Sequence, residues 1–229
     1  MGLLKINYYS YCIQLIIISP VVFGHGMLMD PVNRASAWRR GFNTPINYND
    51  NENYCGGYNV QYTQNKGKCG VCGDDYSLKR PRPNEDGGIY GTKTIVKTYI
   101  EGQEFTANVT LTSNHRGYFE FSLCPLLLSN NNSINNLSSV VEETEECFKK
   151  YPILTVDGKD KYILPSSETG NYQIKLILPK NIICHHCSLR WHWKVANNWG
   201  ICEDGTGGAV GCGPQETFRT CSDITILKL

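Results

Sequence analysis

The chain carries almost no excess of either charge. Its 229 residues include 22 Lys and Arg and 21 Asp and Glu, and the basic residues form no block. Proteins that bind nucleic acid or anionic membranes concentrate positive charge, because they neutralise phosphate groups. We therefore expect neither nucleic acid nor a membrane as a partner.

Long apolar runs are missing after the first two dozen residues. Near the N-terminus, one lysine precedes an apolar stretch over residues 13–23 that is too short to span a bilayer, and Val22 and Gly24 are suited to the positions before a cut. This layout predicts a signal peptide over residues 1–24 and a secreted, extracellular product. Residues 25–229 then carry 21 basic and 21 acidic side chains and form a single catalytic or binding domain.

The chain also lacks internal repeats, a linker and a second domain. Residues 25–82 are loop-like, apart from a helical turn at Ala35–Arg40, and the acidic segment Ser138–Lys150 predicts a short helix. Elsewhere apolar and polar residues alternate, which is typical of half-buried strands. We therefore predict an all-β fold, an immunoglobulin- or fibronectin-III-like sandwich of two sheets with long disulfide-stapled loops and a short helix or two. The strands expected from this alternation include Phe105–Thr112, Tyr118–Cys124, Tyr172–Leu178, Leu189–Val195 and Thr217–Leu227.

Cysteines are abundant, and their number is even once the signal peptide is removed. Cys12 leaves with the signal, and an even number in an exported chain predicts five disulfides without fixing which cysteines pair. Three Asn-x-Ser/Thr sequences, at Asn108, Asn131 and Asn136, are candidate glycosylation sites and fit a secretory route. The ten remaining cysteines are Cys55, Cys69, Cys72, Cys124, Cys147, Cys184, Cys187, Cys202, Cys212 and Cys221.

Cleavage after Gly24 would make His25 the N-terminal residue. Its free α-amine and its imidazole Nδ1 can chelate one metal ion in a small ring. Neutral nitrogen donors suit copper or zinc, and nitrogens in one plane suit copper(II) best. Taken alone, this junction is more simply explained as a signal peptide that happens to precede a histidine.

Two further histidines lie in patterned strands or the turns between them. His115 lies in the turn Asn114–Gly117, so it is either an ordinary surface residue or a neighbour of the N-terminus at one end of the sandwich. His192 alternates with Trp191 and Trp193, so we expect it on the outer, solvated face of its strand or at its edge.

A zinc site is a conceivable use of the remaining histidines. The run Cys-His-His-Cys at residues 184–187 and the Cys-x-x-Cys at residues 69–72 resemble zinc-ligand spacings. More than a hundred residues separate them, and an oxidising compartment favours disulfides instead.

The last strand carries an acidic and an aromatic residue at alternating positions. Glu216 and Phe218 lie on the same strand face and can therefore point to one site, whereas Arg219 points to the other face and receives no role. The simpler alternative is a core phenylalanine beside a surface glutamate.

Four short motifs follow one another along the chain: His25-Gly26 directly after the signal peptide, Asn114-His115-Arg116-Gly117, Cys187-x-Leu189-x-Trp191 with Asn198-Trp199-Gly200, and Gln215-Glu216-x-Phe218-x-x-Cys221-x-Asp223-Ile224. Each motif is weak alone, but their conjunction and order resemble the lytic polysaccharide monooxygenases. The animal and arthropod group called auxiliary activity family 15 is the most similar. The resemblance covers essentially all of residues 25–229.

The resemblance implies a single copper ion held in a histidine brace by the α-amine and Nδ1 of His25 and by Nε2 of His115. Phe218 would occupy the axial position, where family members have Tyr or Phe, and a Phe cannot bind the metal. Glu216 would occupy the Glu or Gln position that tunes an oxygen species by hydrogen bonding. His25, His115, Phe218 and Glu216 are thus the candidate catalytic residues. An external electron donor and O2 or H2O2 would support oxidation at C1 or C4 of a β-1,4 glycosidic bond.

The resemblance favours a crystalline polysaccharide as the substrate, chitin before cellulose, and a monomeric enzyme. Tyr54 and Tyr58 are candidates for a substrate-binding surface, although either could be buried under the loop. A non-catalytic chitin-binding or cuticle protein is the main rival, but it would not need metal ligands. The sequence shows neither a nucleophile motif nor a carboxylate pair placed as in a glycoside hydrolase.

Overall fold

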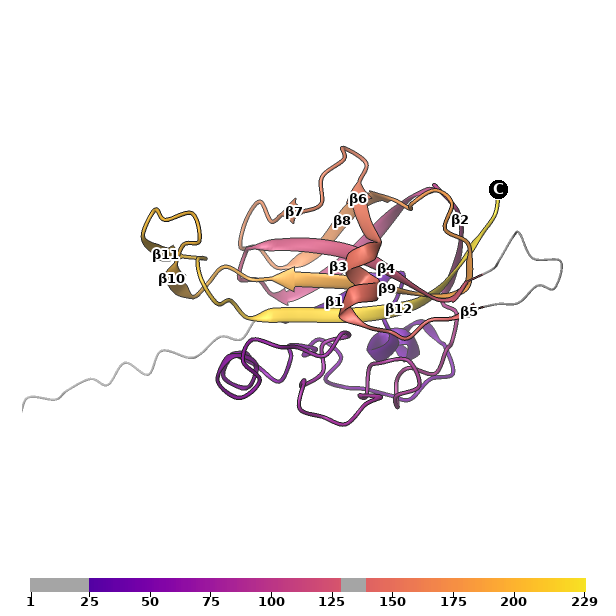
Figure 1. Cartoon of the computed structure of the whole chain (residues 1–229), viewed down its shortest axis with the longest axis horizontal. Helices are drawn as coiled ribbons and strands as arrows, with labels where there is room; N and C mark the ends of the chain where they lie inside the picture. The colour runs from indigo at the N-terminus through magenta and orange to yellow at the C-terminus, as the bar shows by residue number, and fades with distance from the viewer. Residues whose placement is uncertain (1–24, 129–138) are drawn as a thin grey trace, which may run out of the picture.

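The computed structural model describes residues 25–128 and 139–229, whose strands form a curled β-sandwich (Figure 1). One layer consists, in spatial order, of β1 (His25–Asp30), β3 (Glu104–Ser113), β8 (Gly170–Ile177) and β6 (Pro152–Thr155). The other consists of β4 (Tyr118–Leu128), β9 (Cys184–Lys194), β12 (Thr217–Leu227) and β2 (Lys97–Ile100). Strand β6 pairs with both β8 and β4 and so joins the two layers. Among the neighbouring strand pairs of the two layers, only β12 and β2 are parallel. The predicted all-β sandwich is confirmed.

Short elements complete the described part of the chain. The strands β5 (Ser139–Val140) and β7 (Tyr162–Ile163) pair with β4. A separate hairpin of β10 (Trp199–Ile201) and β11 (Gly208–Val210) projects from the end of the sandwich at which β12 begins (Figure 1). The helical segments are the 3-10 helix η1 (Arg34–Arg40), the π-helix η2 (Val60–Gln64) and the α-helix α1 (Glu145–Lys150). No helix among the described residues is long and apolar enough to cross a membrane.

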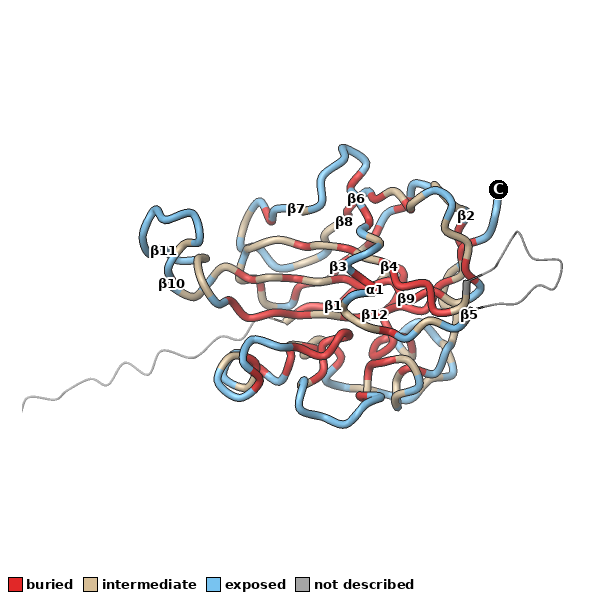
Figure 2. Tube along the Cα trace, viewed as in Figure 1, coloured by how far each residue is buried: buried red, intermediate tan, exposed pale blue. Residues whose placement is uncertain are grey.

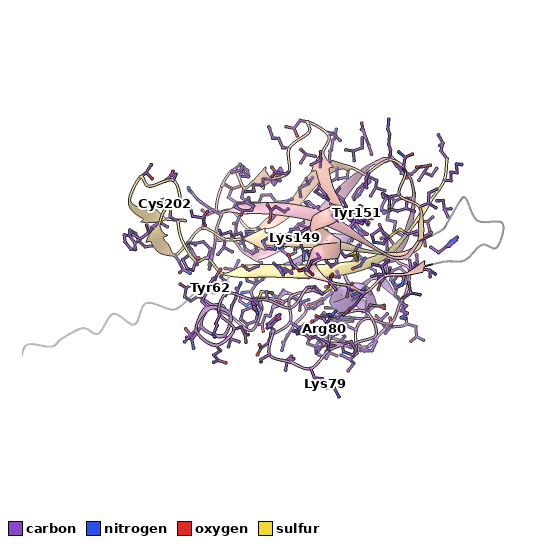
Figure 3. All side chains as sticks on the ribbon, viewed as in Figure 1. Tyr62, Lys79, Arg80, Lys149, Tyr151 and Cys202 are labelled. Atoms are coloured by element: carbon purple, nitrogen blue, oxygen red, sulfur yellow. A yellow bond between two sulfur atoms is a disulfide. The ribbon has the colours of Figure 1, made fainter. Side chains whose placement is uncertain are left out.

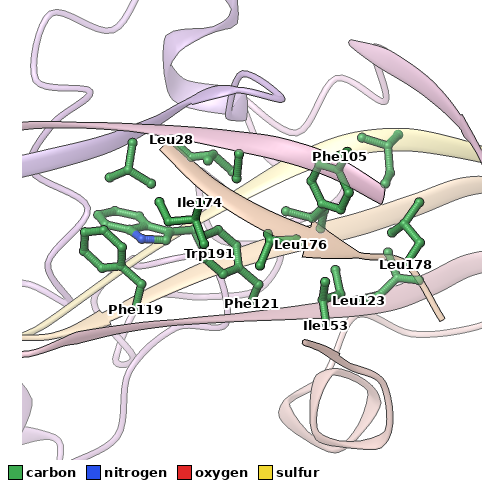
Figure 4. Close-up of a cluster of buried hydrophobic side chains, with 14 of the residues drawn as sticks. Leu28, Phe105, Phe119, Phe121, Leu123, Ile153, Ile174, Leu176, Leu178 and Trp191 are labelled. Carbon is green, nitrogen blue, oxygen red and sulfur yellow. The ribbon is translucent and has the colours of Figure 1, made fainter. Parts of the chain in front are cut away.

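The core lies between the two layers, where alternate residues of each strand point inward. Trp191 and Trp193 of β9 and Phe119 of β4 are fully buried there. They meet Leu28 of β1 and Ile174 of β8 in one apolar cluster (Figure 4). Exposed residues concentrate in the loops and in the β10–β11 hairpin (Figure 2). The apolar alternation of the sequence therefore identified the inward faces correctly.

The first strand is the main element that the sequence analysis missed. Residues 25–30 were expected to be loop, yet β1 pairs with β3 along its length. A Cβ at Gly26 would lie 2.6 Å from Leu111 Cδ2 and 3.1 Å from Trp191 Cη2, so Gly26 occupies an inward position without a side chain. Because glycine adds no apolar signal, the alternation that marks a strand is absent here.

The long N-terminal segment is held to the sandwich by disulfides. All ten cysteines of the described residues are paired, which confirms five disulfides and excludes the zinc site. The bond Cys72–Cys221 links this segment directly to β12. The other pairs are Cys55–Cys69, Cys124–Cys147, Cys184–Cys187 and Cys202–Cys212.

The predicted helix of residues 138–150 is shorter than expected. It begins only after Thr144, whose side-chain oxygen accepts a hydrogen bond from the Cys147 backbone N–H at 3.2 Å. This N-cap fixes the start of α1 at Glu145. The prediction used the acidic character of the whole segment and overlooked Thr144 as a capping residue. Residues 1–24, Asn131 and Asn136 lie outside the described residues, and Asn108 is a half-buried residue of β3.

The prediction that His192 is solvated was wrong. Its side chain lies opposite Trp191 and Trp193, as expected, but it is only 15% exposed. Arg219 Nε donates to its Nδ1 at 3.0 Å. Burial, followed by the charge of Arg219, holds the pKa of His192 well below its usual range. Arg219 of β12 and Glu120 of β4 lie beside it on this outer face, which a single-strand pattern does not reveal.

A buried ion-pair network holds η1 against β12. Arg34 donates to both carboxylate oxygens of Asp223, at 2.6 and 2.9 Å, and lies 3.0 Å from Glu143. All three side chains are at most 3% exposed. Burial alone would raise the pKa of Asp223, but Arg34 and His186 lower it to about 2. Arg34 is the group that pairs with both carboxylates, and His186 contacts Asp223 as well, at 2.8 Å.

Arg34→Met should lower the free energy of unfolding by about 3–5 kcal/mol, because two buried carboxylates lose their cation. Chemical denaturation with the disulfides intact measures this change. Arg40→Met, at an exposed position of the same helix, is the control and should change stability by less than about 0.5 kcal/mol. A loss below about 1 kcal/mol for Arg34→Met would contradict the role assigned to this network.

Candidate functional site

His25 and His115 come together at the end of the sandwich from which the hairpin projects. The β1–β3 register places His25 opposite Ser113, two residues before His115. Burial, and then the nearby His25, lower the pKa of His115. The His115 imidazole is therefore neutral at neutral pH, which is the form that binds metal ions.

The turn that carries His115 is rigid. The Asn114 side-chain amide donates to the carbonyls of Ser166 and Glu168 and to the Tyr172 hydroxyl, and its oxygen accepts from the Arg116 N–H at 2.8 Å. Gly117 has a φ of +87°, and a Cβ there would overlap the Lys194 carbonyl oxygen. The turn therefore requires glycine at this position.

Polar neighbours orient the two imidazole rings. Asn197 contacts His115 Nδ1 through its side-chain amide at 2.7 Å, and Glu52 Oε1 lies 3.4 Å from His25 Nε2. These contacts leave Nε2 of His115 and Nδ1 of His25 for another partner. They are the two ring nitrogens that the family resemblance assigns to the metal.

Glu216 and Phe218 lie beneath this end of the sandwich. Both are buried, Phe218 completely and Glu216 with 4% exposure. The Phe218 ring packs on Trp193 and Tyr54, with ring centroids 4.9 and 6.0 Å away. Burial, followed by the charges of Glu52 and Glu216, raises the pKa of Tyr54.

The two tyrosines proposed for the substrate surface have different environments. Tyr54 is partly buried and belongs to the packing around Phe218, whereas Tyr58 is 39% exposed and contacts the Tyr62 ring at an interplanar angle of 41°. The hairpin adds an exposed aromatic residue, Trp199, which is 64% exposed.

Sequence reasoning missed Asn197, Glu52 and the anchoring role of Asn114. Asn114 belongs to one of the four sequence motifs, and Asn197 directly precedes the motif Asn198-Trp199-Gly200, so the sequence drew attention to both positions. Their contacts were not, because they join segments that are distant in the chain. Glu52 has no comparable signal.

A family model described as "lytic polysaccharide mono-oxygenase, cellulose-degrading" matches residues 25–224. The chain belongs to this family. A solved structure titled as a lytic polysaccharide monooxygenase of auxiliary activity family 15 from Thermobia domestica, in the Cu(I) state, is similar to it. The two sequences are 43% identical, the match covers 89% of this chain and 99% of that one, and the TM-score is 0.80.

Two bacterial structures show a weaker likeness. A family 10 lytic polysaccharide monooxygenase from Streptomyces lividans is 15% identical over 88% of this chain and 99% of that one, with a TM-score of 0.46. A chitin-binding domain from Burkholderia pseudomallei is 12% identical over 89% and 99%, with a TM-score of 0.44. These scores are too low to support an argument about function. No curated protein sequence matches the chain.

Family membership implies a copper-dependent polysaccharide monooxygenase, and the residues at this end of the sandwich fit that metal. Two imidazoles offer one free nitrogen each, and nitrogen donors suit copper. Asn197 and Glu52 contact the opposite ring nitrogens, the usual arrangement around a histidine that binds metal. The Asn197 amide nitrogen faces His115 Nδ1 in the structure. With Nε2 on the metal, Nδ1 of His115 would carry the proton, and the Asn197 amide would turn over so that its oxygen accepts from Nδ1.

Asn197→Ala should weaken copper binding about tenfold or more, because the His115 ring loses the contact that orients it. Competition titration against a copper chelator measures the affinity. Asn171→Ala removes an exposed asparagine from the neighbouring strand β8 and should leave copper affinity unchanged. Equal copper affinities for the unmodified chain, Asn197→Ala and Asn171→Ala would show that Asn197 does not orient a copper ligand.

Proposed function

We propose that residues 25–229, released by cleavage after Gly24, form a secreted copper-dependent monooxygenase that cleaves β-1,4 bonds in chitin by oxidation. One observation carries this proposal. The β1–β3 register brings His25 beside His115, while Glu52 and Asn197 occupy the ring nitrogens not needed for the metal. Cleavage would add the α-amine of His25 to the same donor set.

The copper ion, when bound, would supply the redox chemistry that oxidises the sugar, using electrons from an external donor and O2 or H2O2. The α-amine and Nδ1 of His25 and Nε2 of His115 would hold it. Phe218 supplies an apolar side chain that cannot ligate, backed by Trp193 and Tyr54. Glu216 places a buried carboxylate next to Phe218 in the sequence, where the resemblance implies that it would accept or donate a hydrogen bond.

The substrate surface would include Tyr58 and Trp199, because both present aromatic area to solvent and Trp199 follows two residues after Asn197, the neighbour of His115. Chitin is favoured through the resemblance to the arthropod-type family. Cellulose is the second candidate, and the description of the matching family model favours it.

Mass spectrometry of soluble products tests the activity and the substrate together. Copper-loaded residues 25–229 with ascorbate should release oxidised oligosaccharides from β-chitin, and a parallel reaction on cellulose reports the alternative. Oxidised products from cellulose alone would overturn the chitin assignment. Copper-bound protein that yields no oxidised product from either polymer would favour a non-catalytic binding protein.

One extra residue before His25 should abolish product formation and weaken copper binding at least about a hundredfold, because the α-amine becomes an amide. A chain with an N-terminal Ala-His25 sequence, compared with one starting at His25, measures this effect. Circular dichroism checks that both are folded. Normal turnover by the extended chain would refute the role of the N-terminus.

A further inference from the structure

A cavity of about 560 Å³ separates α1 from the disulfide-stapled loop of residues 67–82. This volume lies in the range of small-molecule sites. The disulfide of Cys69 borders the cavity, and the Cys72–Cys221 bond ties the same loop to β12. Its walls therefore come from segments that are covalently fixed relative to one another.

Cations outnumber carboxylates on the walls of this cavity. Glu145 and Glu146 are the acidic residues that line it. Lys149 extends from α1, and Arg80 extends from the loop below it (Figure 3). The lining cations are Lys68, Arg80, Arg82, Lys149 and Arg219.

Glu145 and Glu85 each pair with two arginines. Glu145 accepts from Arg190 at 2.8 Å and from Arg219 at 3.0 Å. Glu85 accepts from Arg80 and Arg82, at 2.8 and 2.6 Å. The three lining guanidinium groups thus share Glu85 and Glu145 with Arg190, which does not line the cavity. Arg80 also pairs with the exposed Glu142, and the carbonyls of Glu143 and Tyr76 accept from Arg80 and Arg82.

The two lysines of the lining have less compensation than these arginines, which keep their carboxylate partners. In the described ranges, Lys68 and Lys149 form no salt bridge, and Lys68 instead lies 5.2 Å above the Tyr76 ring. Arg82 is 6% exposed, and its buried Nε has no hydrogen-bond partner among the described residues. Burial, and then the nearby Arg190, lower the pKa of Arg219 to about 10, although Glu145 and Glu120 raise it.

We propose that this cavity is a binding site for a small organic anion with at least two negatively charged oxygen groups. Lys68 and Lys149 approach it from opposite walls, and Arg82 and Arg219 form its buried cationic part. Val71 and the Tyr76 ring add apolar surface, which favours an organic anion over a bare inorganic ion. The site involves neither His25 nor His115, so it is independent of the proposed copper chemistry.

Calorimetric titration with benzene-1,3-disulfonate tests the proposal on the folded, copper-loaded chain at constant ionic strength. We expect one saturable site with a dissociation constant at or below about 1 mM. Inorganic sulfate, in a separate titration, should bind at least about fivefold more weakly, because it lacks the apolar ring. Absence of saturation with disulfonate up to about 10 mM would overturn the proposal.

A double variant, Lys68→Gln with Lys149→Gln, locates the binding. Both lysines are exposed, so the fold should persist, and disulfonate affinity should fall at least about fivefold. The matched control, Lys175→Gln with Lys180→Gln, removes two exposed lysines elsewhere and should keep the original affinity. An equal loss of disulfonate affinity in both double variants would show non-specific electrostatic attraction and would contradict the proposed cavity site. A loss of copper affinity on disulfonate binding would place the anion at the metal and would contradict it as well.

Discussion

The close approach of β1 to the tryptophan core is the constraint on which the proposed site depends. Gly26 lies against Leu111 and Trp191, where even a methyl group would force its neighbours to move. This contact lets β1 pair with β3 and fixes His25 opposite Ser113. Because the His115 turn follows directly from β3, the same pairing determines where both imidazoles lie. The metal chemistry therefore depends on a packing requirement of the hydrophobic core.

The long N-terminal segment serves both stability and the site. Arg34 joins it to Asp223 of β12, and the Cys72–Cys221 disulfide makes a second link to the same strand. The same segment places Glu52 beside His25 and the Tyr54 ring against Phe218. A loop of this length could not orient side chains unless it were tied down, because ordering a free chain costs about 1–2 kcal/mol per residue. The buried network and the disulfides thus replace regular secondary structure as the support for this part of the site.

The sequence predicted what depends on local periodicity and on cysteine count. The alternation over Thr217–Leu227 matches β12 with the same bounds, and the even cysteine number is matched by five disulfides. It did not predict β1, because Gly26 gives no apolar signal. It did not predict the burial of His192 either, because the neighbouring side chains, Arg219 and Glu120, come from β12 and β4. The contact between Asn197 and His115 spans 82 residues, and no local pattern reports such a pair. The candidate histidines were thus identifiable from motifs, while the groups that orient them required the fold.

The central claim is that His25 and His115 form one copper site together with the N-terminal amine. Electron paramagnetic resonance of the Cu(II)-loaded chain beginning at His25, with nitrogen hyperfine couplings resolved by pulsed methods, tests it most directly. The account predicts three nitrogen donors, two from His25 and one from His115, and the loss of one of them in His115→Ala. A spectrum of the intact chain with only one nitrogen donor, or one that is unchanged in His115→Ala, would contradict it.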